Sequence, residues 1–289
     1  MEFLINYTCI AQKVLVEKLL HSCNNLKTIY LLLRPKDGKD GRHRLDELLL
    51  SKAFDRVLSK NRSIITKIVP ITGDVTEEGL GISLSDEALL VKNVSVVFHC
   101  AATVKFDEPF RQSVDINVIG TRRVLQLCRK MEHLSALIHV STAYSNCNRQ
   151  DIGEVVYTET VSPTSIIHAT QWMSDSLLDA ITPHLIKGRP CNYHYTKALA
   201  ENLLLTEGVG LPIAIIRPSI ITASWKEPIP GWVDNLNGTS GFIVATGKGI
   251  LRTMVVHRSV SADVIPVDIV VNLMIPAAWQ LGVQRPVTN

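Results

Sequence analysis

The 289-residue sequence predicts an α/β fold with a doubly wound parallel sheet, and two features of the chain support this prediction. Short apolar runs rich in β-branched residues show no alternation with polar residues, which is typical of strands buried on both faces of a parallel sheet. Longer segments with helical periodicity separate these runs, and this order favours right-handed crossovers. The predicted strands cover residues 28–33, 67–72, 94–99, 136–140 and 212–216.

The first strand and helix are predicted at the start of the chain. Residues 1–5 form a short apolar strand, and a helix at 13–21 follows after a turn. Within this helix Leu15 and Leu19 lie one turn apart and contribute to an apolar face. Later segments with helical character are predicted at residues 110–130 and 195–206.

The composition changes after residue 220. The stretch 224–241 is rich in Pro, Gly, Asn and Trp and has neither a helical nor a strand period, which predicts ordered loops or a small lobe. Loops carried on a rigid sheet usually determine ligand specificity. We therefore expect one domain over residues 1–289 with a substrate-side region at about 222–262.

Composition and charge exclude several classes of protein. The chain is 46% hydrophobic with a net charge of +3, so it can bury a large core and lacks the basic surface of a nucleic-acid-binding protein. Its six cysteines form no CxxC pair and no zinc-type spacing, so we expect reduced thiols and no metal site. No uninterrupted apolar run approaches the ~20 residues that span a bilayer, so we expect no transmembrane segment.

The sharpest local feature is the segment YHYTK at residues 193–197. Tyr193 and Lys197 are four residues apart, so on a helix they project from one face. A nearby ammonium group favours the phenolate and lowers the pKa of a tyrosine from its usual ~10. Such a tyrosine can protonate a carbonyl oxygen while hydride reaches the carbon. A surface pair is the alternative interpretation of this short motif, and Tyr195 is expected to point elsewhere.

A strand end with hydroxyl groups provides the next candidate. The apolar run 136–140 is followed directly by Ser141 and Thr142. Ligands of open α/β sheets bind at the carboxyl ends of the strands, so we expect Thr142 to hydrogen-bond a substrate carbonyl. Ser141 and Ser145 are further candidates for this role. Alternatively, these hydroxyl groups only cap the following turn.

Residues with distinctive chemistry also follow three neighbouring strands: Arg34 after 28–33, Asp74 and Val75 after 67–72, and Ala101 and Ala102 after 94–99. An arginine after the second strand accommodates a 2′-phosphate, so Arg34 favours NADPH over NADH. Asp74 is expected to face the adenine edge of the cofactor, and Val75 is a further cofactor-binding candidate. The small Ala101 and Ala102 would allow close approach of the backbone. For Arg34 an exposed loop position is the alternative.

Together these motifs resemble the extended short-chain dehydrogenase/reductases, which have a Rossmann-type sheet, and more narrowly the reductase domain of fatty acyl-CoA reductases. The resemblance covers nearly the whole chain. The broader motifs are Arg34-Pro35, Gly73-Asp74, FHCAATVKFDE (98–108), Asn117 with Gly120-Thr121, HVSTAYSN (139–146), YHYTKALAE (193–201) and IIRPSI (215–220). The narrower resemblance depends on STAYSN, YTKALAE, WKEPIPGW, DNLNG, GKGILRTM and ADVIPVD.

The resemblance implies NADPH-dependent reduction of a long-chain acyl-CoA to a fatty alcohol through an aldehyde. It implies that Thr142 holds the carbonyl oxygen, that Tyr193 protonates it, and that Lys197 binds the nicotinamide ribose and tunes the tyrosine. Pro218 and Ser219 are expected along the nicotinamide half of the cofactor. The family also implies a place in the cytosol or on the cytosolic face of a peroxisomal or endoplasmic reticulum membrane, and it leaves the oligomeric state open.

The turn after the first strand departs from the family pattern. Family members have a GxxGxxG turn there, whereas this chain has Asn6, Cys9 and Gln12 at the three glycine positions. The glycines allow a tight turn, close approach of backbone N–H groups to the pyrophosphate, and close helix–sheet packing. We expect the side chains to obstruct at least one of these functions and to lower the affinity for NADPH far below that of an intact relative.

Two other interpretations stay open. The altered turn favours a catalytically impaired relative, either a truncated product or a silent binding protein, and the chain begins inside its expected first strand and ends before a further expected one. The second alternative is another extended-family reductase that acts on a keto or hydroxy substrate and leaves a thioester unreduced.

Overall fold

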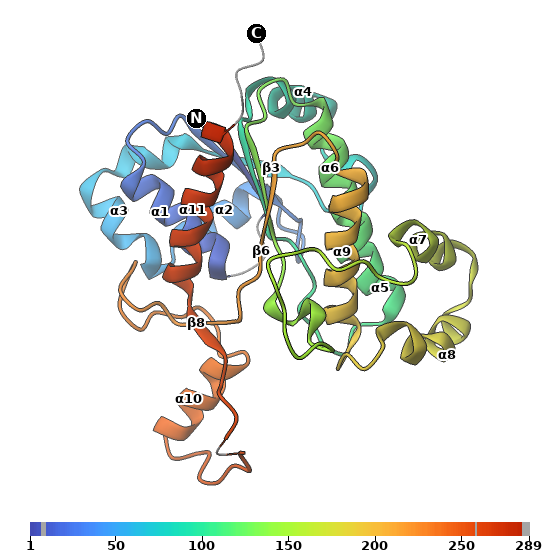
Figure 1. Cartoon of the computed structure of the whole chain (residues 1–289). Coiled ribbons are helices and arrows are strands. Elements are labelled where there is room, and N and C mark those ends of the chain that lie inside the picture. Colours follow the sequence, from blue (N-terminus) through green and yellow to red (C-terminus); the bar gives the residue numbers. More distant parts are fainter. Residues whose placement is uncertain (7–9, 258, 285–289) are drawn as a thin grey trace.

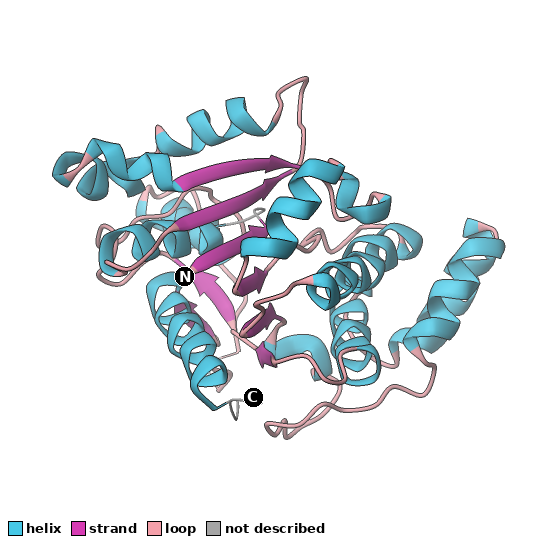
Figure 2. Cartoon of the chain, turned by 90° about the horizontal axis from the view of Figure 1, so that it is seen from above, coloured by secondary structure: helices cyan, strands magenta, loops and turns pink. Residues whose placement is uncertain are grey.

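A computed structural model describes residues 1–6, 10–257 and 259–284. The described residues form a six-stranded parallel sheet in the order β3-β2-β1-β4-β5-β6, which confirms the predicted α/β fold (Figure 2). The order reverses between β1 and β4, the position where open α/β sheets bind their ligands. The strands are β1 (Glu2–Asn6), β2 (Thr28–Leu33), β3 (Ile68–Thr72), β4 (Val96–His99), β5 (Ala136–Val140) and β6 (Ile213–Ile216).

Helices cover both faces of the sheet (Figure 1). One layer contains α1 (Ile10–Ser22), α2 (Gly41–Leu49), α3 (Asp55–Lys60) and α11 (Val267–Gln284). The other contains α4 (Leu84–Asn93), α5 (Phe110–Val114), α6 (Gly120–Lys130), α7 (Pro163–Trp172), α8 (Asp175–Ile186) and α9 (Asn192–Glu207). Short helical turns lie at η1 (Lys52–Phe54), η2 (Arg62–Lys67), η3 (Glu78–Gly81), η4 (Asp115–Ile119) and η5 (Ala143–Asn146).

The two helical layers explain why the strands lack polar alternation. On β1, Ile5 packs into the core beneath α1, whereas its neighbour Leu4 packs into the core on the α6 and α9 side. Ile138 and Leu137 of β5 divide between the two cores in the same way. Since both faces of each strand are covered, consecutive residues are all apolar.

The segment predicted as one helix at 110–130 is interrupted by a π-helical turn. The turn η4 separates α5 from α6 and presents the buried Asn117 to neighbouring loops. Gly120 follows it, and a Cβ at this position would lie 3.2 Å from the Cβ of Val75. The missing side chain therefore allows α6 to approach the end of β3 closely.

Residues 217–257 and 259–266 lie outside the six-stranded sheet and contain the parallel pair β7 (Ile220–Thr222) and β8 (Val264–Pro266), with α10 (Thr239–Gly247) between them. In Figure 1, α10 projects away from the sheet, and none of its residues is buried. The carboxylate of Asp268 fastens this region to α11, since it accepts backbone N–H bonds from Trp225 and Lys226 at 2.8 Å each. Burial opposes ionisation of Asp268, but these backbone bonds outweigh it and lower the pKa below its ordinary value.

Helix α11 is, among the described residues, the one helix long and apolar enough to cross a membrane by length and composition, with a mean hydropathy of 1.2 over 18 residues. Its buried side chains include Val270, Val271 and Met274, which belong to the core beneath α1. Core helices of globular proteins also meet these two requirements, so length and hydropathy alone do not assign α11 to a membrane.

A row of buried polar side chains crosses the sheet at the carboxyl ends of β1, β4 and β5. Asn6 donates from Nδ2 to His99 Nδ1 at 3.0 Å, and the rings of His99 and His139 lie 5.2 Å apart. The hydroxyl of Thr121 donates to the carbonyl oxygen of Asn117 at 2.7 Å, so its oxygen accepts from His99 Nε2 at 3.0 Å. These bonds assign the Nε2–H tautomer to His99.

Both histidines stay neutral at physiological pH. Burial, assisted by the charge of Lys197, lowers the pKa of His99 to about 3. Burial also lowers the pKa of His139 well below 6.5, with smaller contributions from Lys197 and His99. In the unfolded chain both imidazoles would titrate near their ordinary pKa of ~6.5.

Acidification from pH 6.5 to about pH 5 is expected to destabilise the fold through these histidines. In that interval the unfolded chain gains protons on His99 and His139, whereas the folded chain does not. The free energy of unfolding therefore falls by up to about 1.4 kcal/mol per pH unit for each histidine. Urea unfolding across this interval measures the slope. In the variant His139→Gln the slope should be shallower, and an unchanged slope would contradict the assignment.

Candidate functional site

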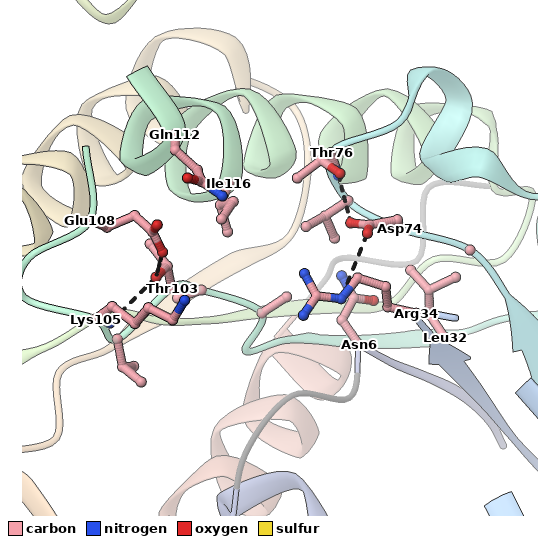
Figure 3. Close-up of a pocket in the computed structure, with 15 residues that line it drawn as sticks. Asn6, Leu32, Arg34, Asp74, Thr76, Thr103, Lys105, Glu108, Gln112 and Ile116 are labelled. Atoms are coloured by element: carbon pink, nitrogen blue, oxygen red, sulfur yellow. Dashed lines mark hydrogen bonds and ion pairs between the residues drawn. The ribbon is translucent and has the colours of Figure 1, made fainter. Parts of the chain in front are cut away.

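The candidate site lies at the carboxyl ends of the strands, where the strand order reverses. A cavity of about 260 Å³ opens there (Figure 3). Five of the residues predicted to bind a cofactor line this cavity: Arg34, Asp74, Val75, Ala101 and Ala102. The structure thus brings together residues from three separate strand ends.

Arg34 and Asp74 face each other across this cavity. Arg34 Nε lies 3.8 Å from Asp74 Oδ2, and the arginine side chain is 58% exposed. Asp74 is held by the backbone N–H of Thr76, which donates to its Oδ1 at 3.0 Å (Figure 3). Arg44 donates to the carbonyl oxygen of Arg34 and so fixes the backbone at that position. The exposed guanidinium can therefore meet an anionic group entering the cavity.

The loop after β4 is anchored by Asn117. The backbone N–H of Thr103 donates to Asn117 Oδ1 at 3.0 Å, and Asn117 Nδ2 donates to Thr196 Oγ1 at 2.9 Å. Asn117 therefore couples the loop that carries Ala101 and Ala102 to helix α9. In the sequence Asn117 is recognisable only as part of a motif, and this anchoring contact was not predicted.

Two side chains that flank the altered turn, those of Asn6 and Gln12, point into the protein. Asn6 is 1% exposed and Gln12 is fully buried. Gln12 Nε2 donates to the carbonyl oxygen of Asn6 at 2.6 Å, and Asn6 itself binds His99. Asn6 also lines the cavity, close to Arg34 (Figure 3). Cys9 lies outside the described residues.

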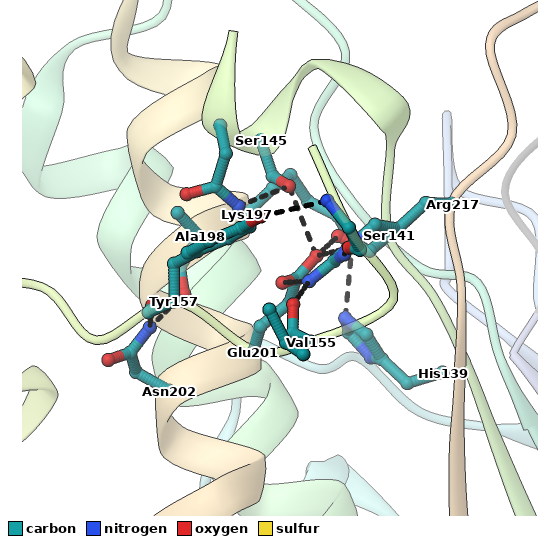
Figure 4. A network of polar contacts seen from close by, with 12 residues as sticks. His139, Ser141, Ser145, Val155, Tyr157, Lys197, Ala198, Glu201, Asn202 and Arg217 are labelled. Atoms are coloured by element: carbon teal, nitrogen blue, oxygen red, sulfur yellow. Dashed lines mark hydrogen bonds and ion pairs between the residues drawn. The ribbon is translucent and has the colours of Figure 1, made fainter. Parts of the chain in front are cut away.

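Helix α9 carries Tyr193 in its first turn and Lys197 in the next. The ring of Tyr193 packs against Phe106, with the centroids 5.8 Å apart. Lys197 is 1% exposed, and its ammonium group donates to the carbonyl oxygen of Val140 at 2.7 Å (Figure 4). Its Nζ also lies 3.5 Å from Nε2 of the neutral His139. The lysine thus ties α9 to the carboxyl end of β5.

Thr142 lies two residues beyond Val140 and is 5% exposed. Its Oγ1 accepts from the backbone N–H of Tyr144 at 3.2 Å and caps η5, as the alternative interpretation proposed. This bond uses an oxygen lone pair and leaves the hydroxyl proton available for a ligand. In contrast, Ser141 and Ser145 both donate to the buried Glu201, at 2.5 and 3.1 Å.

Pro218 and Ser219 lie beside the turn of Thr142. The backbone N–H of Ala143 donates to the carbonyl oxygen of Pro218 at 2.9 Å. Since Lys197 binds Val140 in the same segment, the structure gathers residues 140–143, residues 218–219 and the first turns of α9 at one end of the sheet.

None of the described residues of the substrate-side region (222–262) lines the cavity at Arg34. A second, open groove of about 1000 Å³ begins at Tyr144 and runs along the free edge of β6 to Leu273. Trp232 lies instead beneath the ammonium group of Lys13, 5.7 Å from the ring centroid. Trp225 is exposed and stacks against its neighbour Lys226.

Known proteins resemble this chain closely in sequence. The NAD-binding family described as male sterility protein matches residues 12–274. Fatty acyl-CoA reductase 1 of Xenopus laevis is 51% identical over 274 residues, which cover 95% of this chain and 53% of the relative. Fatty acyl-CoA reductases 1 and 2 of Homo sapiens are 48% and 47% identical with the same coverage. The chain therefore spans about half the length of the curated relatives it matches.

Solved structures support the fold. The terminal R domain of the myxalamid PKS-NRPS pathway has a TM-score of 0.64 at 24% identity and covers 99% of this chain and 63% of that one. The reductase domain of a non-ribosomal peptide synthetase from Mycobacterium tuberculosis has a TM-score of 0.66 at 20% identity and covers 98% and 64%. The family match over residues 12–274, together with the curated relatives of about 50% identity, shows that the chain belongs to the NAD-binding male sterility protein family, which is the family of the fatty acyl-CoA reductases.

Proposed function

We propose that this chain carries out the chemistry of a fatty acyl-CoA reductase, the NADPH-dependent reduction of a long-chain acyl-CoA to a primary alcohol through an aldehyde. The observation that carries the proposal is the bond from Lys197 to the carbonyl oxygen of Val140, which sets the helix of Tyr193 against the strand end of Thr142. The identity of about half the residues to curated fatty acyl-CoA reductases supports the substrate class.

In this proposal the chain's own groups manage the carbonyl oxygen and its proton. The hydroxyl of Thr142 donates a hydrogen bond to the carbonyl oxygen, and the phenol of Tyr193 delivers a proton to it. Lys197, held by Val140, places a positive charge one turn from Tyr193 and favours loss of the phenolic proton. The nicotinamide cofactor supplies hydride to the carbonyl carbon when it is bound. Two such reductions convert the thioester first to the aldehyde with release of CoA and then to the alcohol.

The residues of the cavity fit the adenosine half of a dinucleotide. Arg34 offers an exposed cation after the second strand, the position that accommodates a 2′-phosphate. Ala101 and Ala102 carry short side chains where the backbone would meet the cofactor. This chemistry supports NADPH over NADH.

A catalytically silent relative is the second candidate, and one observation favours it. Asn6 and Gln12 stand at two glycine positions of the family turn, and both side chains are engaged in buried hydrogen bonds, Asn6 with His99 and Gln12 with the carbonyl oxygen of Asn6. Both candidates share the expected location in the cytosol or at the cytosolic face of a peroxisomal or endoplasmic reticulum membrane.

The variant Tyr193→Phe is expected to lose turnover of palmitoyl-CoA with NADPH by about 10²- to 10⁴-fold, because the proton donor is gone. Mass spectrometry of the aldehyde and alcohol products measures this loss. The matched control is Tyr195→Phe, which removes a buried phenol whose ring stacks on Phe110 at 6.2 Å and which should keep turnover.

Two outcomes of this assay would contradict the proposed function and support one of its alternatives. An equal background in the unaltered chain and in Tyr193→Phe would favour the silent relative. Turnover of a ketone without turnover of the thioester would instead identify a reductase for keto substrates.

Removal of the Arg34 side chain should weaken NADPH binding about tenfold or more, because hydrogen bonds to a charged group contribute roughly 1.5–3 kcal/mol. NADH lacks the 2′-phosphate, so its Kd should not change. Cofactor fluorescence measures both constants. The control Arg42→Ala removes an exposed arginine of α2 that pairs with Asp46, and it should leave both constants unaltered. Equal losses for the two cofactors in Arg34→Ala would contradict the assigned function of Arg34.

The altered turn should make NADPH binding weaker than micromolar, because Asn6 and Gln12 occupy positions where family members bring backbone to the pyrophosphate. Fluorescence titration of the purified, folded chain measures the Kd. Micromolar or tighter binding would show that the side chains at this turn do not obstruct the cofactor.

A further inference from the structure

Glu201 is a buried carboxylate next to the candidate catalytic residues. It lies on α9 one helical turn after Lys197 and two turns after Tyr193, and it is 1% exposed. A carboxylate in such a place is costly to the fold unless hydrogen bonds and an opposite charge compensate it. In the sequence Glu201 appears only as the last residue of the motif YHYTKALAE, and its burial was not expected, because a glutamate on a helix is usually exposed.

Four hydrogen bonds satisfy this carboxylate (Figure 4). Oε1 accepts from Ser141 Oγ at 2.5 Å, from Ser145 Oγ at 3.1 Å and from Arg217 Nε at 2.9 Å. Oε2 accepts from Arg217 Nη2 at 2.6 Å. Arg217 is therefore bound through two nitrogens, which fixes the orientation of both groups.

Two partners of Glu201 are the direct chain neighbours of candidate site residues. Ser141 directly precedes Thr142, and Arg217 directly precedes Pro218. The backbone N–H of Ser141 also donates to the carbonyl oxygen of Ile216 at 2.7 Å, so the two segments lie side by side. The side chain of Glu201 therefore binds Ser141, which precedes the candidate carbonyl-binding Thr142. It also binds Arg217, which precedes the nicotinamide-side segment 218–219.

Arg217 also links Glu201 to the loop that contains Gly153 and Val155. Its Nη1 and Nη2 donate to the carbonyl oxygens of Gly153 at 3.1 Å and Val155 at 2.7 Å. The hydrogen bond to Glu201 raises the pKa of Arg217, so the guanidinium stays charged. Without the carboxylate, Arg217 would keep its backbone partners but would no longer be drawn toward α9.

We propose that Glu201 is a positioning residue for the reductase site: through Ser141 and Arg217 it sets where Thr142 and Pro218 stand relative to Tyr193 and Lys197. The inference rests on the proposed function for the roles of those four residues. Glu201 does not contact the substrate in this proposal and acts only through its neighbours.

The chain contains a matched pair that separates positioning from stability. Glu17 of α1 is fully buried and accepts from Arg56 Nε at 2.6 Å and Nη2 at 2.8 Å, the same two-nitrogen arrangement. Glu17 belongs to the helical layer on the opposite face of the sheet from α9. Loss of either carboxylate should lower stability, but only loss of Glu201 should disturb the turn of Thr142.

The experiment compares Glu201→Gln, Ser141→Ala and Glu17→Gln in the full chain. Peptide-level hydrogen exchange over residues 141–147 reports the turn directly, since the backbone N–H of Ala143 is bonded to Pro218. In Glu201→Gln we expect exchange there to be faster than in Glu17→Gln at a similar Tm. We also expect kcat to fall about 10- to 100-fold, because small misplacements of reacting groups have effects of this size. The Kd for NADPH should rise by a smaller factor than kcat falls, because Glu201 does not line the Arg34 cavity and disturbs only the nicotinamide side of the site.

Each outcome shows whether Glu201 positions the site or only contributes to the stability of the fold. Equal exchange over 141–147 and equal kcat in Glu201→Gln and Glu17→Gln would overturn the proposal. If Glu201→Gln does not fold, Ser141→Ala decides, since it removes one bond to the carboxylate and should speed exchange and lower kcat to a smaller extent. If the unaltered chain has no turnover, the proposed function fails, whereas the exchange comparison still shows whether Glu201 holds the turn.

Discussion

The structure of the candidate site depends on one buried ammonium group, that of Lys197, which lies between α9 and the carboxyl end of β5. Lys197 is almost fully excluded from water, and its charge is met by the carbonyl oxygen of Val140 at 2.7 Å and by a neutral imidazole, His139. A buried cation imposes strict demands on its neighbours, because any group that becomes positive or withdraws its lone pair raises the energy of the fold. The registration of α9 on β5, and thus the place of Tyr193, follows from satisfying this charge.

The fold could be predicted from the sequence wherever burial produces a recognisable pattern of apolar residues. Each strand of the six-stranded sheet is enclosed by two helical layers, so the apolar runs identified all six of its strands, whereas the short pair β7 and β8 was not predicted. Helix α10 could not be found in this way, because none of its residues is buried and no apolar stripe is needed. Helix α11 carries apolar residues around most of its surface, including Leu273 and Trp279 on exposed positions, and this masks its amphipathic period.

Site residues could be predicted where their spacing in the sequence determines their arrangement. They could not be predicted where their role depends on contacts with segments far along the chain. Tyr193 and Lys197 are recognisable because their spacing alone places them on one helical face, and Thr142 because a hydroxyl follows an apolar strand. Asn117 and Glu201 are ordinary polar residues in sequence. Their importance comes from burial against segments far along the chain, as with Thr103 and Thr196 for the asparagine.

The amide of Asn6 has a consequence for the direction of a long series of hydrogen bonds. Every donor along it points the same way, from Asn6 to His99, then Thr121, then the carbonyl of Asn117, whose side-chain amide continues to Thr196. The hydroxyl of Thr196 ends the series at the backbone oxygens of the first turn of α9. Aligned dipoles of this kind polarise one another. An aspartate in place of Asn6 would present an acceptor to an acceptor and force the imidazole to carry its proton on Nδ1. Thr121 would then have to donate to His99 Nε2, and the carbonyl oxygen of Asn117 would lose its bond from this hydroxyl.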